Sequence, residues 1–277
     1  MSAQDLHKMC DIAASIGKEK SLTGNFGMGA KVASLPSNQH GMRYRSCKDG
    51  LVSEVILCKG EDADGRLRRK DESGLVHEVV DVTDLAKEEG YDTAFDWTEV
   101  VLFGNRPDQD TVRDPYNGDP PQDAQWIATY LYHRFYRLPE GVRVVLKKGT
   151  NKLDGNRAFD PIPARLERHF EKHETVTTER GIKIHYIYDA PYDKAASHNR
   201  SISGAIASAV STCAVVYRDE MYDVGKGRIW TQNAPIFGIP FGARHISVHV
   251  ELPDDAAVIS DGYRQFLRYS SGEQAQV

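Results

Sequence analysis

The stretch M-R-Y-R-S-C-K-D-G-L-V-S-E-V-I-L-C-K, residues 42–59, carries the clearest structural signal in this chain. Two segments that suit strands, Met42–Cys47 and Leu51–Lys59, flank the dipeptide Asp49-Gly50. An Asp-Gly pair favours the tight turn of a β-hairpin because both positions tolerate positive φ. The spacing therefore predicts a hairpin in which residue 47 pairs with about residue 52.

More strands and helices are expected on both sides of this hairpin. His77–Val82 and Thr98–Phe103 are rich in β-branched residues, which favours strands. The other elements expected in this half are helices over residues 2–16 (with Ser2 as N-cap), about 29–36 and 122–138, and a strand over residues 142–147. Residues 60–74 and 105–121 are expected to be loops. This order indicates an α/β fold, an α+β sandwich with a mainly antiparallel sheet.

A domain boundary is expected within Lys148–Pro163, where Gly, Asn, Asp and two prolines cluster. The sequence is therefore divided into domains over residues 1–150 and 151–277. In the second domain we expect strands over residues 182–188, 209–217, 237–241 and 245–252, a loop over 225–235 and a helix over 260–269. This pattern predicts a second, smaller α/β unit.

Composition narrows the class of protein. The chain has 277 residues, enough for two domains, with 40% hydrophobic and 27% charged residues. A net charge of −5 argues against strong general affinity for nucleic acid. No apolar run reaches the length of a membrane span, and the first residues do not resemble a signal peptide, so no membrane partner is expected.

The four cysteines, Cys10, Cys47, Cys58 and Cys213, contain no C-x-x-C pair. The predicted hairpin register does not place Cys47 opposite Cys58. We therefore expect reduced thiols and a cytoplasmic protein.

The strongest functional signal is the stretch T-G-N-F-G-M-G-A-K-V-A, residues 23–33. Three glycines within six residues lead directly into a helical pattern, so free backbone N–H groups would face a ligand at a helix N-terminus. This arrangement suits a phosphate group. The spacing matches neither the dinucleotide-binding G-x-G-x-x-G after a first strand nor a Walker A loop. A helix-entry turn without a ligand is the alternative interpretation.

Together with M-S-A-Q-D-L and A-S-I-G-K-E-K upstream, this stretch resembles the Hsp90-like (GHKL) ATPases, which include gyrase B, MutL, MORC proteins and histidine kinases. The resemblance implies the C-terminal part of a GHKL (Bergerat-type) ATPase domain followed by an S5-like transducer domain. Gly24, Gly27 and Gly29 would then end a flexible ATP lid. Within this resemblance, the backbone amides that would wrap the triphosphate are those of Gly24, Asn25, Phe26, Gly27, Met28 and Gly29.

The same resemblance implies ATP and Mg²⁺ as ligands. Lys18, Lys20 and Lys31 are candidate cations for the phosphates, although each is also a normal solvated lysine. Thr98 corresponds to the threonine that reaches the adenine side in this family, but Trp97 replaces the usual preceding glycine. A transducer cation usually reaches the γ-phosphate. The candidates for that role are Arg218, Lys226 and Arg244.

Several parts of the family's machinery are not found in this sequence. The glutamate that activates water, the asparagine that holds magnesium and the aspartate of D-x-G-x-G would all precede Met1. We therefore expect an N-terminally incomplete ATPase, with apolar surface and a strand edge exposed beside Thr98. The intact protein would hydrolyse ATP and form a homodimer through its ATPase domain, whereas this chain alone would be nearly inactive. No catalytic residue is assigned within it.

Two other interpretations stay open. The chain is alternatively a non-catalytic assembly module on an ATPase-derived scaffold. His169 and His173 have a spacing that zinc uses on a helix, but no third ligand is evident. His245 and His249 would share one face of a strand, where packing is the simpler role.

Overall fold

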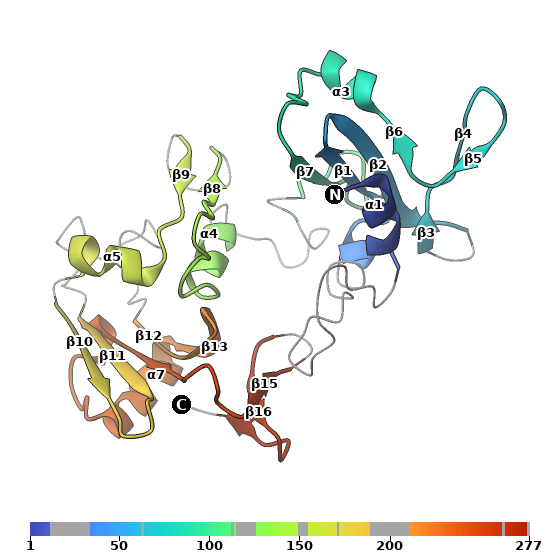
Figure 1. Cartoon of the computed structure of the whole chain (residues 1–277). Helices are drawn as coiled ribbons and strands as arrows, with labels where there is room; N and C mark the ends of the chain where they lie inside the picture. Colours follow the sequence, from blue (N-terminus) through green and yellow to red (C-terminus); the bar gives the residue numbers. More distant parts are fainter. Residues whose placement is uncertain are drawn as a thin grey trace. The chain divides into compact units, whose positions relative to one another are not determined.

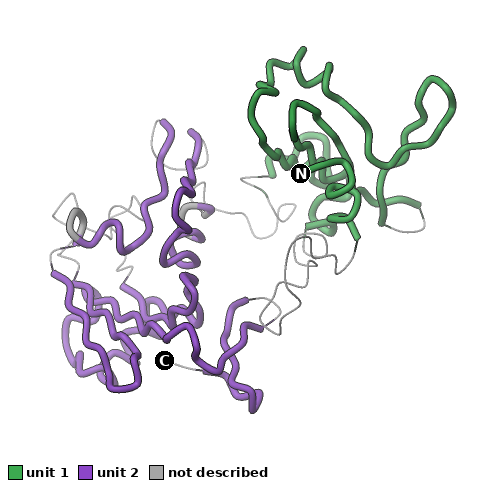
Figure 2. Tube along the Cα trace, viewed as in Figure 1, with its two compact units in different colours: residues 1–122 green, residues 123–277 purple. Residues whose placement is uncertain are grey.

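The computed structural model describes residues 1–11, 34–61, 64–111, 114, 126–148, 155–170, 172–188, 211–261 and 264–275. The chain divides into two compact units, residues 1–122 and 123–277 (Figure 2). Each unit contains a mostly antiparallel sheet and a few short helices, so the expected mixed α/β fold is observed. The division expected from the sequence, at about residue 150, lies within the second of these units.

Unit 1 is built on one antiparallel sheet with the strand order β3-β2-β1-β7, and β6 pairs with β2 (Figure 1). The bounds are β1 Met42–Lys48, β2 Leu51–Lys59, β3 Asp64–Arg66, β6 Val80–Asp81 and β7 Trp97–Leu102. A small separate ladder joins β4 Arg69–Lys70 to β5 Val76–His77. The strand expected over residues 77–82 is thus split into two short pieces.

The predicted hairpin is confirmed in detail. Asp49 and Gly50 both have positive φ, 51° and 82°, and Cys47 pairs with Val52. Strand β7 pairs with the other side of β1, so that Ser46 lies opposite Thr98. This pairing of β7 with β1 therefore places Thr98 on the same face of the sheet as Ser46.

The helices of unit 1 are α1 (Ala3–Met9), the 3-10 turn η1 (Leu35–Ser37) and α3 (Thr83–Glu88). Ser2 is the N-cap of α1, as predicted, and forms a capping box with Asp5. Leu6 of α1 is fully buried against Met42, Tyr44, Val55 and Leu57, which lie on one face of the β1–β2 hairpin. Ala86 of α3 packs with Cys47 and Val52 on the other face.

Unit 2 contains a five-stranded sheet with the order β10-β11-β14-β12-β13. All neighbours are antiparallel except β12 and β14, which are parallel. The strands are β10 Lys172–Thr177, β11 Lys183–Tyr188, β12 Thr212–Tyr217, β13 Glu220–Lys226 and β14 Ile246–Glu251. Two smaller ladders consist of β8 Val145–Leu146 with β9 Arg157–Ala158, and of β15 Val258–Ser260, β16 Leu267–Tyr269 and β17 Gln274–Ala275.

Apolar clusters cover both faces of this sheet. Tyr136 and α5 (Ile162–His169) pack on the face that carries Ile187, Ala214 and Val216. Trp230 of α7 (Gly227–Asn233) packs on the opposite face with Cys213 and Val248. The remaining elements are α4 (Trp126–Tyr132) and the 3-10 turns η2 (Ala234–Phe237) and η3 (Ala243–His245).

Three local predictions for unit 2 are wrong. Residues 225–235 form the end of β13 and helix α7 rather than a loop, and residues 237–241 form the end of η2 and a turn rather than a strand. The predicted helix over 260–269 is a β-hairpin, because the Asp261 carboxylate accepts hydrogen bonds from the N–H groups of Gln265 and Phe266 and closes a turn. Helix α5 begins within the segment expected to be a domain boundary.

Candidate nucleotide site

The predicted lid lies outside the described residues. Lys18, Lys20 and Lys31 belong to residues 12–33, together with the glycine loop Gly24, Asn25, Phe26, Gly27, Met28 and Gly29, and the structure describes none of these residues. Their role as phosphate ligands therefore stays a prediction. The described part of the candidate site consists of Thr98 and its surroundings on the sheet of unit 1.

Thr98 lies at the beginning of β7 and belongs to a small network of hydroxyl groups. Its Oγ1 is 3.0 Å from Oγ of Ser46, which is fully buried on β1. Ser46 Oγ donates to the backbone carbonyl of Trp97 at 3.0 Å and accepts from the Met1 amino group at 2.6 Å. The Ser46 hydroxyl has one proton, and it donates that proton to the Trp97 carbonyl. In the pair with Thr98, Ser46 therefore accepts and the Thr98 hydroxyl donates. The exposed Thr98 oxygen is then left with a lone pair for a ligand that donates a hydrogen bond.

The face of β7 that carries Thr98 is only partly covered. Val100 and Leu102 alternate with Thr98 along this face and are 50% and 38% exposed. Their partners on β1, Tyr44 and Met42, are buried beneath α1. Among the described residues, β7 has a partner strand on one side only, since it ends the strand order β3-β2-β1-β7. Within the described part of the chain, Thr98 thus lies on an end strand beside partly exposed apolar side chains.

The opposite face of the same sheet holds a network of ion pairs. The Arg45 guanidinium is 2.5 Å from both Glu54 and Glu89, and Arg69 is 2.6 Å from the other oxygen of Glu54. Arg45 and Glu54 are almost completely buried. Burial alone would raise the pKa of Glu54, but hydrogen bonds from Arg45 and Arg69 lower it below its usual value.

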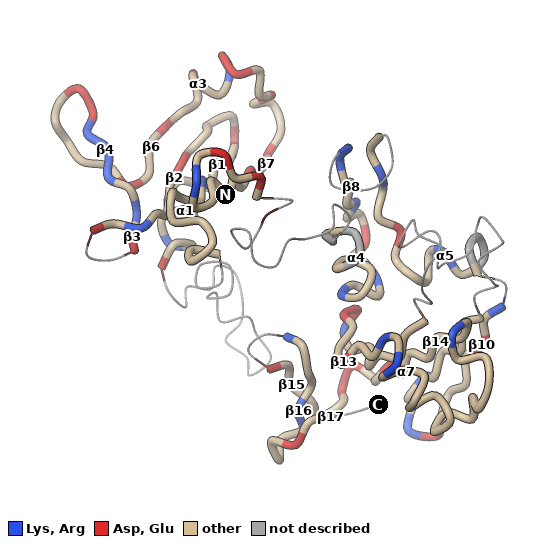
Figure 3. The backbone as a smooth tube through the Cα atoms, turned by 180° about the vertical axis from the view of Figure 1, so that it is seen from behind, with Lys and Arg blue, Asp and Glu red and all other residues tan. Residues whose placement is uncertain are grey.

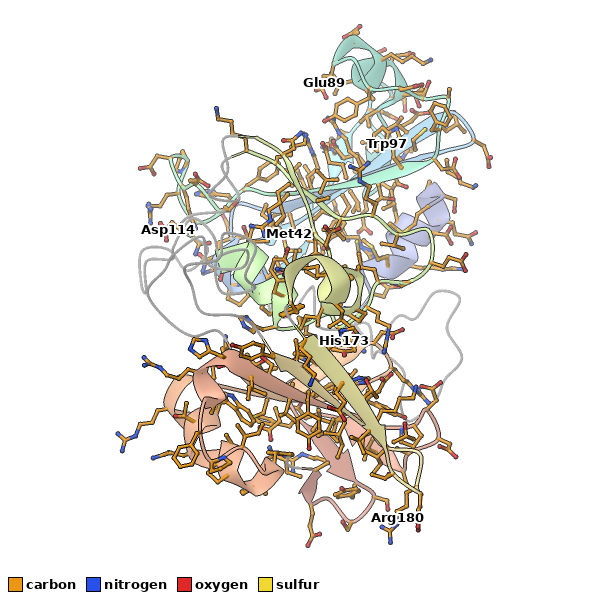
Figure 4. The ribbon with its side chains drawn as sticks, turned by 90° about the vertical axis from the view of Figure 1, so that its left-hand side faces the viewer. Met42, Glu89, Trp97, Asp114, His173 and Arg180 are labelled. Atoms are coloured by element: carbon orange, nitrogen blue, oxygen red, sulfur yellow. The ribbon has the colours of Figure 1, made fainter. Side chains whose placement is uncertain are left out.

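The ion-pair network also holds β7 in place. Glu99 of β7 accepts from Arg43 at 3.0 Å and from the Tyr91 hydroxyl at 2.6 Å. Tyr91 stacks on Trp97, whose indole N–H donates to the Asp92 carbonyl. Figure 4 labels Trp97 within this unit. Trp97 and Glu99, which flank Thr98 in the chain, are thus both held by contacts on the opposite face of the sheet. This support gives the Thr98 hydroxyl a defined position on the open face.

Two cavities formed by described residues lie away from Thr98. A cavity of about 780 Å³ in unit 1 is lined by Ala3, His7, Arg68, Lys70, Val76, His77, Glu78 and Val79. A second one, of about 450 Å³, lies in unit 2 beside Arg137, Phe159 and Pro161. Thr98 lines neither cavity. The candidate site is therefore an open sheet face rather than an enclosed pocket.

The three candidate transducer cations do not lie together. Arg218 is in the turn between β12 and β13, where its guanidinium lies over the Tyr217 ring. Lys226 ends β13 at its other end, and Arg244 lies in η3. Lys226 and Arg244 are exposed near α7, whereas Arg218 is at the opposite end of β13. The structure favours no single one of them as a phosphate ligand.

The proposed zinc spacing of His169 and His173 is not realised. His169 is the last residue of α5, whereas His173 lies in β10, so the two residues do not belong to one helix. Within the described residues, no group of three His, Cys, Asp or Glu side chains is placed to hold a metal ion. All four cysteines are free thiols.

The prediction that His245 and His249 share a strand face is wrong as well. His245 belongs to η3, before β14 begins, while His249 is completely buried within β14. His249 Nε2 lies 2.9 Å from the Thr212 hydroxyl, and its ring packs edge-on against Tyr136. Burial, with His185 and His133 nearby, lowers the pKa of His249 to about 3. His249 is therefore a neutral packing residue.

Ser46 and the Arg45–Glu54 pair were not identified from the sequence. The signal was present, because the Asp49-Gly50 turn places Arg45 directly opposite Glu54. Opposite charges at paired positions of a hairpin indicate a cross-strand ion pair. Ser46 becomes noticeable only once β7 is known to pair with β1, which no local pattern specifies.

No protein-family model matches this sequence, and no curated protein matches it either. The resemblance to the Hsp90-like ATPases therefore depends on the residues quoted for it. Within the described part of the chain, no helix is both long and apolar enough to cross a lipid bilayer.

Proposed function

We propose that this chain is part of an Hsp90-like ATPase and contributes an ATP lid and one wall of an adenine site. In this proposal the loop Gly24–Gly29, with Lys18 and Lys31, binds the triphosphate of ATP together with Mg²⁺. Thr98 contributes to the adenine side. The S5-like transducer assignment for residues 151–277 and homodimer formation by the intact protein belong to the same proposal.

The observation that carries the proposal is the geometry around Thr98. Its hydroxyl oxygen has a free lone pair on an open sheet face, and the amino group of adenine is a donor of the matching kind. The Met1 amino group donates to Ser46 next to Thr98, so the residue that precedes α1 lies beside this hydroxyl.

The open edge of β7 is the second support. Val100 and Leu102 leave an apolar strip beside Thr98 that a further strand or helix would cover. The glutamate, asparagine and aspartate of the family's active site would be on such elements. Catalysis is accordingly assigned to the intact protein, and this chain alone is expected to hydrolyse ATP poorly.

Calorimetric titration with a non-hydrolysable ATP analogue and Mg²⁺ tests the proposal. Binding is expected to be weakened about tenfold or more by Thr98→Val, which keeps the side-chain shape and removes the hydroxyl. Gly27→Asp is expected to abolish binding, because it adds a negative charge to the lid. Thr175→Val, at an exposed threonine on β10, is the matched control and leaves binding unchanged.

The alternative is a non-catalytic assembly module, and the same titration separates it from the proposal. If this chain binds no nucleotide, the experiment is repeated on the product extended by in-frame coding sequence upstream of Met1. Absence of binding there as well favours the assembly module. Binding that is equally strong in Thr98→Val and the wild type removes Thr98 from the site.

A further inference from the structure

A projecting apolar surface surrounded by positive charge lies on α7 and the turns after it. We call it the basic surface, and define it by Lys226, Arg228, Ile229, Ile236, Phe241 and Arg244. Ile229, Ile236 and Phe241 are 64%, 78% and 87% exposed, which is unusual for large apolar side chains. Large apolar side chains exposed on α7 and on elements that contact it indicate an interaction site rather than ordinary solvent exposure.

The backbone beneath this surface is held firmly. The buried indole N–H of Trp230 lies 2.9 Å from two carbonyl oxygens, those of Ala243 and Ile246. The Trp230 ring also contacts Phe237, with 6.0 Å between ring centroids. The exposed side chains project from an ordered base, so little conformational entropy would be lost when a partner binds them.

The charge of this region is opposite to that of the whole chain. Residues 224–250 contain three cations, Lys226, Arg228 and Arg244, and no Asp or Glu, although the chain has a net charge of −5. All three cations are exposed, and none forms an ion pair with a described residue. Figure 3 shows basic positions in blue beside the label of α7. The partner should therefore be acidic and should also carry apolar side chains.

The same chain has a surface with this complementary character. We call it the acidic surface, and define it by Asp84, Leu85, Glu88, Asp92 and Phe95, on α3 and the turn that follows (Figure 3). Phe95 and Leu85 are 71% and 44% exposed. The Asp84 side chain is 96% exposed, and its Oδ1 lies 3.8 Å from Nζ of Lys87 on the same helix. Charge and apolar content thus complement those of the basic surface.

We propose that the basic surface of one molecule binds the acidic surface of a second copy of this chain. Like charges disfavour pairing of two basic or two acidic surfaces, so the contact joins two different surfaces. A contact of this heterologous kind continues from copy to copy unless it closes into a ring. Association should therefore grow with protein concentration and weaken with added salt.

Sedimentation velocity at low and high salt tests the proposal over a wide range of protein concentration. We expect concentration-dependent oligomers at low salt. Phe241→Ser is expected to weaken this association about tenfold or more, because it removes the most exposed apolar anchor. Val176→Ser, at a 44% exposed valine on β10, is the matched control and keeps the wild-type association.

A charge exchange makes the test specific for this pair of surfaces. The double variants Arg228→Glu/Arg244→Glu and Asp84→Lys/Glu88→Lys should each remain monomeric alone, while an equimolar mixture should associate again. A wild-type protein that is monomeric at all concentrations overturns the proposal, as does self-association of either double variant alone. Cosedimentation of a monomeric wild type with anionic lipid vesicles would overturn it in favour of a membrane surface.

Discussion

Arg45 in unit 1 and His249 in unit 2 both lie on interior strands and are almost completely buried, at 3% and 1% exposure. Arg45 keeps its charge because Glu54 and Glu89 lie 2.5 Å from its guanidinium. Among the described residues, the side-chain hydrogen-bond partner of His249 is the uncharged Thr212 hydroxyl, and two further histidines lie nearby, so His249 stays neutral. The difference teaches that the partner, and not the depth of burial, decides whether a basic side chain is ionised in these sheets.

The largest effect is expected from removing the cation of the buried pair. Arg45→Met should destabilise unit 1 by about 3 kcal/mol, because it leaves the buried Glu54 carboxylate with Arg69 alone. Native-state hydrogen exchange resolved by segment would show the loss of protection in residues 42–59 and not in residues 211–251. The double variant Arg45→Met/Glu54→Leu should recover most of the stability. If the double variant were less stable than Arg45→Met, the loss of the Arg45–Glu54 pair would not be the cause of the destabilisation.

An intermediate effect is expected from acid. The folded pKa of His249 is about 3, below its usual 6.5, so the unfolded state binds a proton more readily. Unit 2 should therefore be most stable above about pH 6.5 and lose up to about 1.4 kcal/mol per pH unit below it, about 2 kcal/mol by pH 5. His249→Gln should flatten this slope, measured by urea unfolding at several pH values. An unchanged slope would assign the acid sensitivity to other groups.

Unit 1 should begin to lose stability at a lower pH than unit 2. The pKa of Glu54 is held below its usual 4.5, so its contribution to stability is complete above that value and is lost only as the pH falls through the lowered pKa. Between pH 6 and 5 the protection of residues 211–251 against hydrogen exchange should decrease first. Earlier loss of protection in residues 42–59 would contradict this order.

The smallest effect is expected at the exposed end of β1, the strand that also carries Arg45. Lys48 and Asp96 form an ion pair at 2.5 Å, but their side chains are 46% and 51% exposed. Water screens such a pair, and ordering two side chains opposes it. Lys48→Gln should therefore leave the urea midpoint of unit 1 unchanged within error. A clear shift of that midpoint would show that exposure does not weaken this pair.

The sequence predicts best where one local interaction determines the conformation. Asp49-Gly50 specifies a hairpin and its register, and Ser2 with Asp5 specifies the beginning of α1. The β12–β13 hairpin was not predicted because its turn consists of Arg218 and Asp219, which adopt positive φ although neither is a glycine. Helix α7 was not predicted because its first residue, Gly227, is typical of a turn and because Trp230 is held in place by tertiary contacts.

The candidate site divides in the same way. Thr98 could be placed on a strand from its β-branched neighbours, and β7 has the expected bounds to within one residue. Its hydroxyl partner Ser46 depends on pairing between strands that are about fifty residues apart, which no local pattern encodes. The lid residues 24–29 lie outside the described residues, so their prediction still depends on the sequence alone.

The parallel pairing of β12 with β14 has a consequence for synthesis on the ribosome. Strand β14 is the last of the five strands to be made, yet it lies between β11 and β12. The β10–β11 and β12–β13 hairpins can form as soon as they emerge, but they have no common neighbour until residues 246–251 are available. The growing chain therefore presents two unjoined hairpins, whose apolar faces need protection from other nascent chains until β14 inserts between them.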